Sequence, residues 1–277
     1  MFSLNLRGRL LSVDRPLVMG ILNLTQDSFH ADSRVPSPEE AVALALRQLE
    51  EGADILDLGA QSTRPGSRRM DAMEEIPRLI PVIGGILDAH PEAILSVDTY
   101  HSSVASAAVE AGALLVNDVS GGTMDPHMFS MVASMKVPYV CMHMQGRPET
   151  MQDSPIYRDV AAELMDFFAG RIRDAREAGI HDIIIDPGFG FGKTLAHNYT
   201  LLDALPLFRE FGVPVMVGLS RKSMIQKVLS ISSAEALNGT TALHTVALLK
   251  GADILRVHDV RQAREVVRLL SELPGRK

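Results

Sequence analysis

The chain has little cysteine and no long apolar run. Cys141 is its single cysteine, which excludes an intramolecular disulfide and a cysteine-rich metal site. No apolar run approaches the length that spans a membrane. Arg7, Arg9 and Asp14 lie where the apolar core of a signal peptide would be needed. We therefore expect a soluble cytoplasmic protein with no membrane partner.

A surplus of positive charge is also missing. The 277 residues include 34 Asp or Glu and 27 Lys or Arg, for a formal net charge of −7. Nonspecific binding to nucleic acid or to an anionic membrane depends on a basic surface, so neither partner is expected. A small anionic substrate bound by a local basic cluster remains possible. The apolar content of 46% suits a globular protein with a large core.

Four motifs of nucleotide binding or catalysis are absent. Residues 187–194 form a glycine-rich loop that ends in Gly-Lys-Thr, yet a P-loop requires glycine where Pro187 stands. The loop glycines fall at every second position, which is not the dinucleotide-binding spacing. Neither Gly-x-Ser-x-Gly nor His-Glu-x-x-His occurs, so nothing supports covalent nucleophilic catalysis or zinc hydrolysis. We expect Lys193 to be a solvated lysine and the glycines to serve tight turns.

Short apolar strands alternate with amphipathic helices along the chain. Residues 3–13 predict a β-hairpin, and long helices are expected at 38–51, after the N-cap Ser37, and at 155–178. Eight strands are expected, at 16–22, 53–58, 94–97, 114–116, 137–142, 183–185, 213–217 and 252–257. Near-continuous apolar strands of this kind are typical of parallel sheets buried on both faces. The pattern predicts one α/β domain over residues 1–277, a (β/α)8 TIM barrel with a short N-terminal β-hairpin. A doubly wound sheet is the alternative.

Polar residues end most of these strands. In a barrel the carboxyl ends of the strands surround the active site. Asp98, Asn117 and Asp186 offer hydrogen-bond acceptors and one amide, which suits a flat heterocycle with several N–H donors and a carbonyl. Asp57 either joins this set or only organises its loop through hydrogen bonds to the backbone. His143 is expected to be a structural histidine.

A second set of candidate residues is cationic. It comprises Arg64, Lys222, Arg256 and His258. Arginine forks suit phosphate oxygens. Asn23 could give an oxygen ligand to Mg²⁺, which usually relies on water and on substrate phosphates. The two sets together indicate a site for an uncharged ring at one end and a phosphorylated group at the other.

Eight segments carry a resemblance to the dihydropteroate synthase family, in the order in which that family has them. Two of them are Ser62-Thr63-Arg64-Pro65-Gly66 and Asp186-Pro187-Gly188-Phe189-Gly190. The segments span residues 19–29, 57–66, 96–100, 116–122, 142–144, 186–193, 218–223 and 256–260. The resemblance implies a pterin-binding (β/α)8 barrel that joins 6-hydroxymethyl-7,8-dihydropterin diphosphate to 4-aminobenzoate and releases pyrophosphate. It also implies a homodimer and a requirement for Mg²⁺.

The resemblance assigns roles to individual residues. The pterin would be held by Asp98, Asn117, Asp186, Lys222, Arg256 and Met142. The aminobenzoate pocket would consist of Thr63, Pro65, Phe191 and Ser220, together with Lys222. The diphosphate would be bound by Asn23, Arg64, Arg256 and His258, with Asn23 also at the metal. The catalytic set would be Arg64, Lys222, Arg256 and His258.

The first two loops depart from the family pattern. Gln26 replaces a proline, and Gln61 replaces an acid. His30-Ala31-Asp32-Ser33 stand where the family commonly has Ser-Asp-Gly-Gly, so the acid is shifted by one position and the glycines are absent. Two alternatives therefore stay open. One is a methyltetrahydrofolate-dependent methyltransferase on the same barrel, although it has no need of the Ser-Thr-Arg-Pro loop. The other is a homologue that binds pterin without catalysis.

Overall fold

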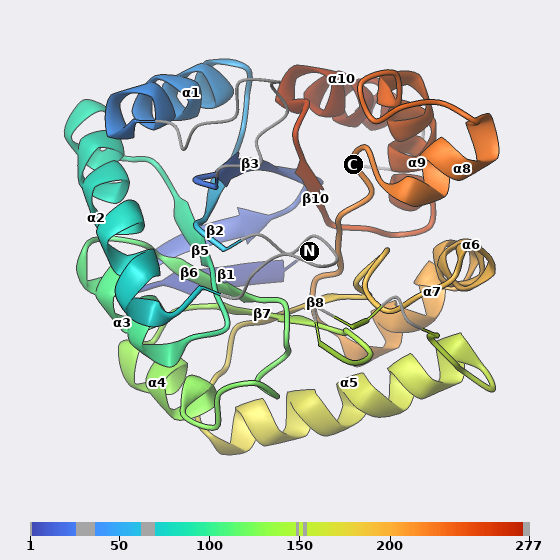
Figure 1. Cartoon of the computed structure of the whole chain (residues 1–277), viewed down its shortest axis with the longest axis horizontal. Coiled ribbons are helices and arrows are strands. Elements are labelled where there is room, and N and C mark those ends of the chain that lie inside the picture. The colour runs from blue at the N-terminus through green and yellow to red at the C-terminus, as the bar shows by residue number, and fades with distance from the viewer. Residues whose placement is uncertain (1, 26–36, 62–69, 148–149, 152–153, 274–277) are drawn as a thin grey trace.

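Eight parallel strands form one sheet that closes into a barrel (Figure 1). The computed structural model describes residues 2–25, 37–61, 70–147, 150–151 and 154–273. The barrel strands are β3 Leu17–Asn23, β4 Ile55–Gly59, β5 Leu95–Asp98, β6 Leu115–Asp118, β7 Tyr139–Met142, β8 Ile183–Asp186, β9 Met216–Val217 and β10 Ile254–Val257. Their order is β8-β7-β6-β5-β4-β3-β10-β9, and a parallel bridge between Ile185 and Val215 joins the two edges. The predicted barrel is confirmed, and the doubly wound alternative, which leaves two open edges, is wrong.

Helices surround the barrel on its outer side (Figure 1). They are α1 Pro38–Glu50, α2 Ala72–Ala89, α3 Ser102–Glu110, α4 Met128–Met135, α5 Val160–Glu177, α6 Leu195–Asp203, α7 Leu205–Phe208, α8 Ser223–Leu229, α9 Leu237–Leu249 and α10 Val260–Ser271, with a 3₁₀ turn at Arg209–Phe211. The main apolar core lies between these helices and the strands. Within the described residues, no helix has both the length and the apolar character that crossing a bilayer requires.

Local capping explains where two of the long helices begin. The Ser37 hydroxyl accepts from the Glu40 amide at 3.3 Å, and the Glu40 carboxylate accepts from the Ser37 amide at 2.8 Å, so α1 begins where the sequence predicted. Helix α5 begins at Val160 rather than at 155, because Asp159 is the N-cap and its carboxylate binds the first backbone amides of the helix. Strand β9 is also shorter than expected, with two residues in place of five.

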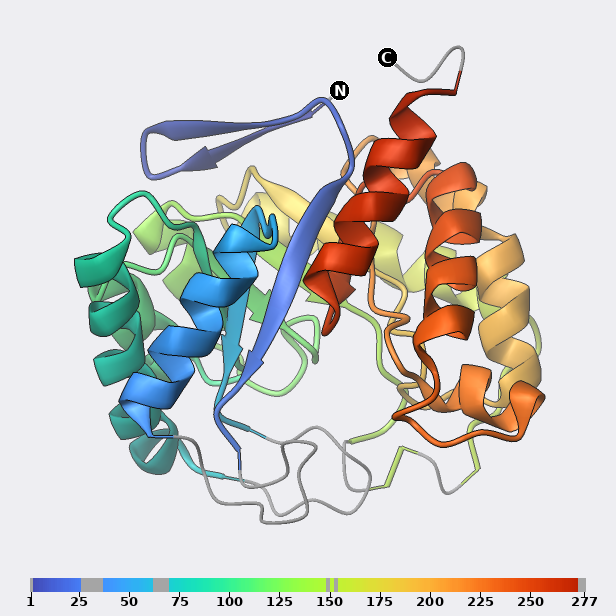
Figure 2. The same ribbon diagram turned by 90° about the horizontal axis from the view of Figure 1, so that it is seen from above.

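The N-terminal hairpin covers the amino end of the barrel (Figure 2). Strands β1 Phe2–Leu6 and β2 Arg9–Val13 pair antiparallel, as predicted. Leu4, Leu6 and Val13 are buried in one cluster with the first inward-facing side chains of the barrel strands. The hairpin therefore closes this end of the barrel and leaves the carboxyl ends of the strands for a site.

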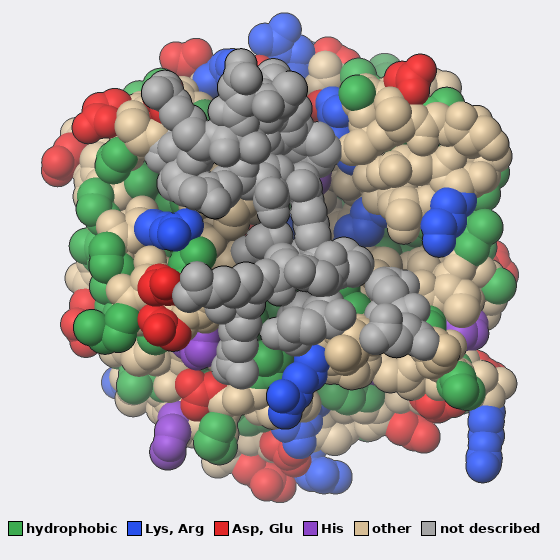
Figure 3. Space-filling model, viewed as in Figure 1, with side chains coloured by type: hydrophobic (Ala, Val, Ile, Leu, Met, Phe, Trp, Pro, Cys, Tyr) green, Lys and Arg blue, Asp and Glu red, His purple; other side chains and the backbone are tan. Residues whose placement is uncertain are grey.

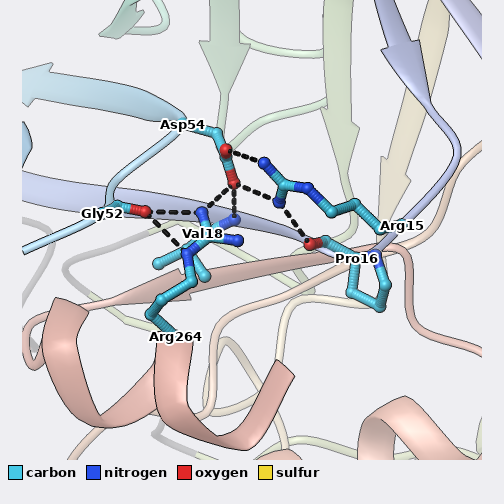
Figure 4. Close-up of polar contacts among 6 residues, drawn as sticks. All are labelled: Arg15, Pro16, Val18, Gly52, Asp54 and Arg264. Carbon is cyan, nitrogen blue, oxygen red and sulfur yellow. Dashed lines mark hydrogen bonds and ion pairs between the residues drawn. The ribbon is translucent and has the colours of Figure 1, made fainter. Parts of the chain in front are cut away.

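At the amino end of the barrel, the carboxylate of Asp54 binds residues from separate segments of the chain (Figure 4). Asp54 accepts from the backbone amide of Val18 at 2.8 Å, from Arg15 Nη2 at 2.7 Å and from Arg264 Nη2 of α10. Burial would raise the pKa of Asp54, but these hydrogen bonds outweigh burial and hold the pKa below its ordinary value. The cluster fixes the start of β3 against α10, far along the chain.

Candidate active site

The inward-facing side chains change from apolar to polar along the barrel axis. Near the amino ends they form one apolar layer, with Met19, Ile55, Ile94, Leu115, Val140, Ile184, Met216 and Ile254. Because side chains alternate between the two faces of a strand, the residues two positions further along also point inward. In six strands these residues are Asp57, Ser96, Asn117, Met142, Asp186 and Arg256. A largely polar layer of side chains therefore lies next to the apolar layer, towards the carboxyl ends of the strands, where the sequence predicted the site.

Arg256 lies at the centre of the polar layer. Its Nε donates to Asp57 Oδ2 and its Nη2 donates to Asp98 Oδ2, both at 2.6 Å. Asn117 Nδ2 donates to the same oxygen of Asp57 at 2.9 Å. The Asp57 side chain is fully buried, and those of Arg256 and Asp98 are 19% and 10% exposed. Asp57 thus joins the predicted site residues, and the alternative that it only organises a loop is wrong.

Two carboxylates share this one guanidinium. Burial raises the pKa of Asp98 to about 7, against the attraction of Arg256 and with the help of the nearby charge of Asp57. Burial would lower the pKa of Arg256, but Asp57 and Asp98 outweigh burial and raise it. Asp98 therefore exchanges a proton near neutral pH while Arg256 keeps its charge.

Asp186, which is buried, and Lys222, which is partly buried, provide a second pair of opposite charges. Asp186 Oδ1 accepts from the backbone amide of Gly188 at 2.8 Å. Burial raises the pKa of Asp186, against this hydrogen bond and the charge of Lys222. Burial also lowers the pKa of Lys222 to about 8, against the attraction of Asp186. Lys222 Nζ donates to the carbonyl of Phe189 and lies 4.3 Å from the centroid of the Phe191 ring, so a cation faces an aromatic wall.

Ser220 and His258 form a polar pair at the ends of β9 and β10. The Ser220 hydroxyl oxygen accepts from the His258 backbone amide at 3.2 Å and lies 3.0 Å from His258 Nδ1. Burial and the charge of Arg256 lower the pKa of His258 to about 4, so the ring is neutral at pH 7. We assign the hydroxyl proton to the bond with Nδ1, which places the ring proton on Nε2.

The glycine-rich loop after β8 needs its glycines, as predicted. Gly188, Gly190 and Gly192 have φ of 68°, 82° and 60°. A Cβ atom on Gly188 would lie 2.0 Å from the carbonyl oxygen of His143. Only glycine fits a backbone that passes so close to the end of β7.

Lys193 corrects one expectation from the sequence. It is 3% exposed, and its Nζ donates to the carbonyls of Gly188 at 2.9 Å, Phe191 at 3.0 Å and His143 at 3.2 Å. Nζ also lies 3.0 Å from His143 Nδ1. Burial lowers the pKa of Lys193 well below its ordinary value. The prediction of a solvated lysine is wrong, because the failed P-loop spacing excluded a phosphate ligand but gave no information about burial.

Other predicted residues lie at the mouth of the barrel or outside the described ranges. Met142 packs with Tyr100 and Val119, and Phe191 packs against this group. Asn23 ends β3 beside Gly59 of β4. Three predicted residues lie outside the described residues, namely Thr63, Arg64 and Pro65.

Sequence reasoning missed the part that Lys193 has in the loop and undervalued Asp57. A lysine that follows glycines immediately and has no acidic neighbour was the available signal for Lys193. For Asp57 the signal was an acid two positions after an inward-facing Ile55.

Gln61, which replaces a family acid, is buried and accepts from the Met70 amide at 2.6 Å and from the Tyr100 hydroxyl at 3.2 Å.

Known proteins resemble this chain over nearly its whole length. The sequence profile of the family described as "Pterin binding enzyme" matches residues 19–258. The dihydropteroate synthase of Escherichia coli strain K12 is 41% identical over 266 residues, which cover 95% of this chain and 94% of that protein. A crystal structure of Yersinia pestis dihydropteroate synthase with a sulfonamide drug has a TM-score of 0.93 at 39% identity and covers 98% of both chains. The Xanthomonas albilineans dihydropteroate synthase with 4-aminobenzoic acid has a TM-score of 0.90 at 43% identity and covers 98% of this chain and 99% of that one.

The barrel and its polar layer define a pterin-binding enzyme of the (β/α)8 class. The chain belongs to this family and, within it, to the dihydropteroate synthases. The resemblance of its motifs is therefore confirmed by the full-length comparisons.

Proposed function

We propose that this chain condenses 6-hydroxymethyl-7,8-dihydropterin diphosphate with 4-aminobenzoate and releases pyrophosphate. One observation supports the proposal: the buried polar residues Asp98, Asn117 and Asp186 lie with the shared cation Arg256 at the carboxyl ends of the barrel strands. Such a layer matches a ring that has several N–H donors and carries a phosphorylated arm.

The acceptors would recognise the edge of the pterin ring. A buried carboxylate that meets N–H donors recovers the hydrogen bonds it loses on desolvation, whereas an apolar ring would leave it unsatisfied. Lys222 can donate to a ring acceptor from the opposite side, and Met142 supplies apolar contact. Burial already raises the pKa of Asp186, so N–H donors from a ligand relieve an unfavourable buried charge.

The other two ligand parts would bind on either side of the pterin. The diphosphate would be held by Asn23, Arg64, Arg256 and His258, with His258 donating from Nε2. The aminobenzoate would lie against Phe191, with Ser220, Lys222, Thr63 and Pro65 around it. The neutral pair of Ser220 and His258 would then stand between the two substrates.

The chemistry requires no general base. An aromatic amine is neutral at physiological pH and already nucleophilic, so the difficult event is cleavage of the carbon–oxygen bond as diphosphate leaves. Arg256 and His258 would stabilise the charge that develops on the leaving group. The buried layer would position the reacting carbon and exclude water. The pterin ring itself can support positive charge on its exocyclic methylene, which favours a loose displacement.

Charge balance supports a requirement for Mg²⁺. Among the described residues at this end of the barrel, Asp57, Asp98 and Asp186 oppose Arg256 and Lys222, while His258 is neutral. The described residues thus offer no surplus of positive charge to a diphosphate. They also contain no cluster of three His, Cys, Asp or Glu side chains that could hold a metal. This donor set fits Mg²⁺ bound mainly by water and diphosphate, with Asn23 as its protein ligand, and the ion would neutralise the leaving group.

Turnover by the purified protein tests the proposal. The protein is incubated with pterin diphosphate, 4-aminobenzoate and Mg²⁺, and dihydropteroate and pyrophosphate are quantified separately. We expect both in equal amounts, and we expect EDTA to abolish turnover. Pyrophosphate without dihydropteroate, or tight pterin binding without turnover, would contradict the proposal and support the non-catalytic alternative. Methyl transfer from methyltetrahydrofolate would support the methyltransferase alternative.

We also propose that the protein acts as a homodimer in the cytoplasm. Leu207, Val228, Leu229 and Leu249 on α7, α8 and α9 are each about half exposed, which supports an apolar interface on this side of the barrel. On the face seen in Figure 3, acidic and basic side chains of the described residues are interspersed around the rim. Sedimentation equilibrium of the wild type and of Leu249→Glu tests the dimer, and a monomeric wild type would refute it.

A further inference from the structure

The loop at residues 187–192 crosses the mouth of the barrel with little backbone bonding of its own. Among the described residues, a backbone hydrogen bond within the loop joins the Phe191 amide to the Gly188 carbonyl at 3.1 Å. Side chains from outside the loop bind several of its backbone groups. Asn198 accepts from the Gly190 amide at 2.7 Å, and Tyr157 donates to the Gly192 carbonyl at 2.9 Å. The position of Phe191 therefore depends on the side chains that hold this loop.

Lys193 holds the loop at both ends from beneath. It donates to the carbonyls of Gly188 and Phe191, and it connects both to His143 at the end of β7. Three carbonyl acceptors within 3.2 Å match the three N–H groups of an ammonium better than the two of a neutral amine. At 3% exposure, the amine is buried, and its donors bind protein acceptors.

The other lysine that reaches the loop lies on the substrate side. Lys222 donates to the Phe189 carbonyl and faces the Phe191 ring. In the proposed reaction Lys222 contacts both the pterin and aminobenzoate, so its bond to the loop changes when substrates bind. Lys193 has no such contact and can hold Phe191 throughout the cycle.

We propose that Lys193 is a positioning residue that fixes Phe191 as the wall of the aminobenzoate pocket. The inference rests on the proposed function, because it assigns Phe191 to that substrate. Removal of the amine leaves the Gly188 and Phe191 carbonyls buried without a donor, and the loop must move to reach water. The pterin residues Asp98 and Asn117 belong to other strands and are bound through Asp57 and Arg256, so they keep their places. Asp186 accepts from the Gly188 amide of the loop, but its backbone is fixed in strand β8, so it stays beside the pterin.

Steady-state kinetics of two Lys193 variants tests the inference. Lys193→Met keeps the length of the side chain and removes its donors, and Lys193→Gln keeps two donors without the charge. For Lys193→Met we expect the KM for aminobenzoate to rise roughly tenfold or more, while the KM for pterin diphosphate stays within about twofold. Lys193→Gln should lie between Lys193→Met and the wild type. Lys227→Met on the exposed side of α8 is the matched control and should behave as wild type.

The possible outcomes test the role of Lys193 and the proposed function separately. A wild type that makes no dihydropteroate refutes the proposed function, whatever the variants do. If the wild type is active, unchanged aminobenzoate KM in Lys193→Met, or equal rises in both KM values, overturns the inference alone. A role in stability only would lower the active fraction and leave both KM values unchanged. If the Lys193 variants fail to fold, Tyr157→Phe decides, since it removes the Gly192 bond and should raise the aminobenzoate KM by about threefold. An unchanged value there also overturns the inference.

Discussion

Because Asp57 and Asp98 share Arg256, substitutions of these two acids should have non-additive effects on the free energy of unfolding. Each carboxylate lies 2.6 Å from a guanidinium nitrogen, and all three side chains are at most 19% exposed. One carboxylate is enough to pair the guanidinium, and loss of the other relieves repulsion between the two acids. Asp57→Asn and Asp98→Asn should therefore each change the free energy of unfolding by only about 1 kcal/mol.

The double substitution should behave differently. It removes both carboxylates that hydrogen-bond the guanidinium of Arg256, and the loss of a buried ion-pair partner typically costs about 3–5 kcal/mol. The coupling free energy between the two sites should therefore be at least about 1 kcal/mol. Urea unfolding at pH 8, where Asp98 is ionised, measures all four proteins of the cycle. Additive changes, within about 0.5 kcal/mol, would refute the shared pairing of Arg256.

Three further predictions concern binding, pH and the amino end. Asp186→Ala should weaken pterin binding by about a hundredfold in calorimetry while the far-UV spectrum is retained, and unchanged affinity would remove Asp186 from the site. Because the folded pKa of Asp98 is raised from 3.8 to about 7, folded protein binds the extra proton, so the free energy of unfolding should fall as pH rises through that window. Asp98→Asn should reduce the dependence of the free energy of unfolding on pH by up to ~1.4 kcal/mol per pH unit. An unchanged dependence would contradict the raised pKa of Asp98. Asp54→Ala should lower the free energy of unfolding by about 2–3 kcal/mol, because Arg264 loses its partner, and kcat at 25 °C should be unchanged. A comparable loss of kcat would show that this cluster also acts on the active site.

The barrel and the residues of its polar layer could be predicted because both follow from local patterns. Continuous apolar strands such as residues 183–185 identify a sheet buried on both faces. An acid such as Asp98 or Asp186 at the end of such a strand marks the open end of the barrel. The boundaries depended on finer chemistry: the cap formed by Asp159 set the start of α5, which the periodicity of the sequence placed five residues too early.

The partners within the site could not be predicted in the same way. Asp57 and Arg256 are 199 residues apart, and no local pattern indicates which acid the arginine contacts. The contacts of Lys193 could not be predicted from a local pattern either. Its burial follows from three carbonyls that two separate segments bring together, and the sequence showed only a lysine after a glycine.

A crystal structure with bound 6-hydroxymethyl-7,8-dihydropterin diphosphate tests the central claim most directly. We expect ring N–H groups within hydrogen-bond distance of Asp98 and Asp186, and phosphate oxygens among Asn23, Arg256 and His258. A ring bound elsewhere, or a diphosphate that contacts neither Arg256 nor His258, would contradict it.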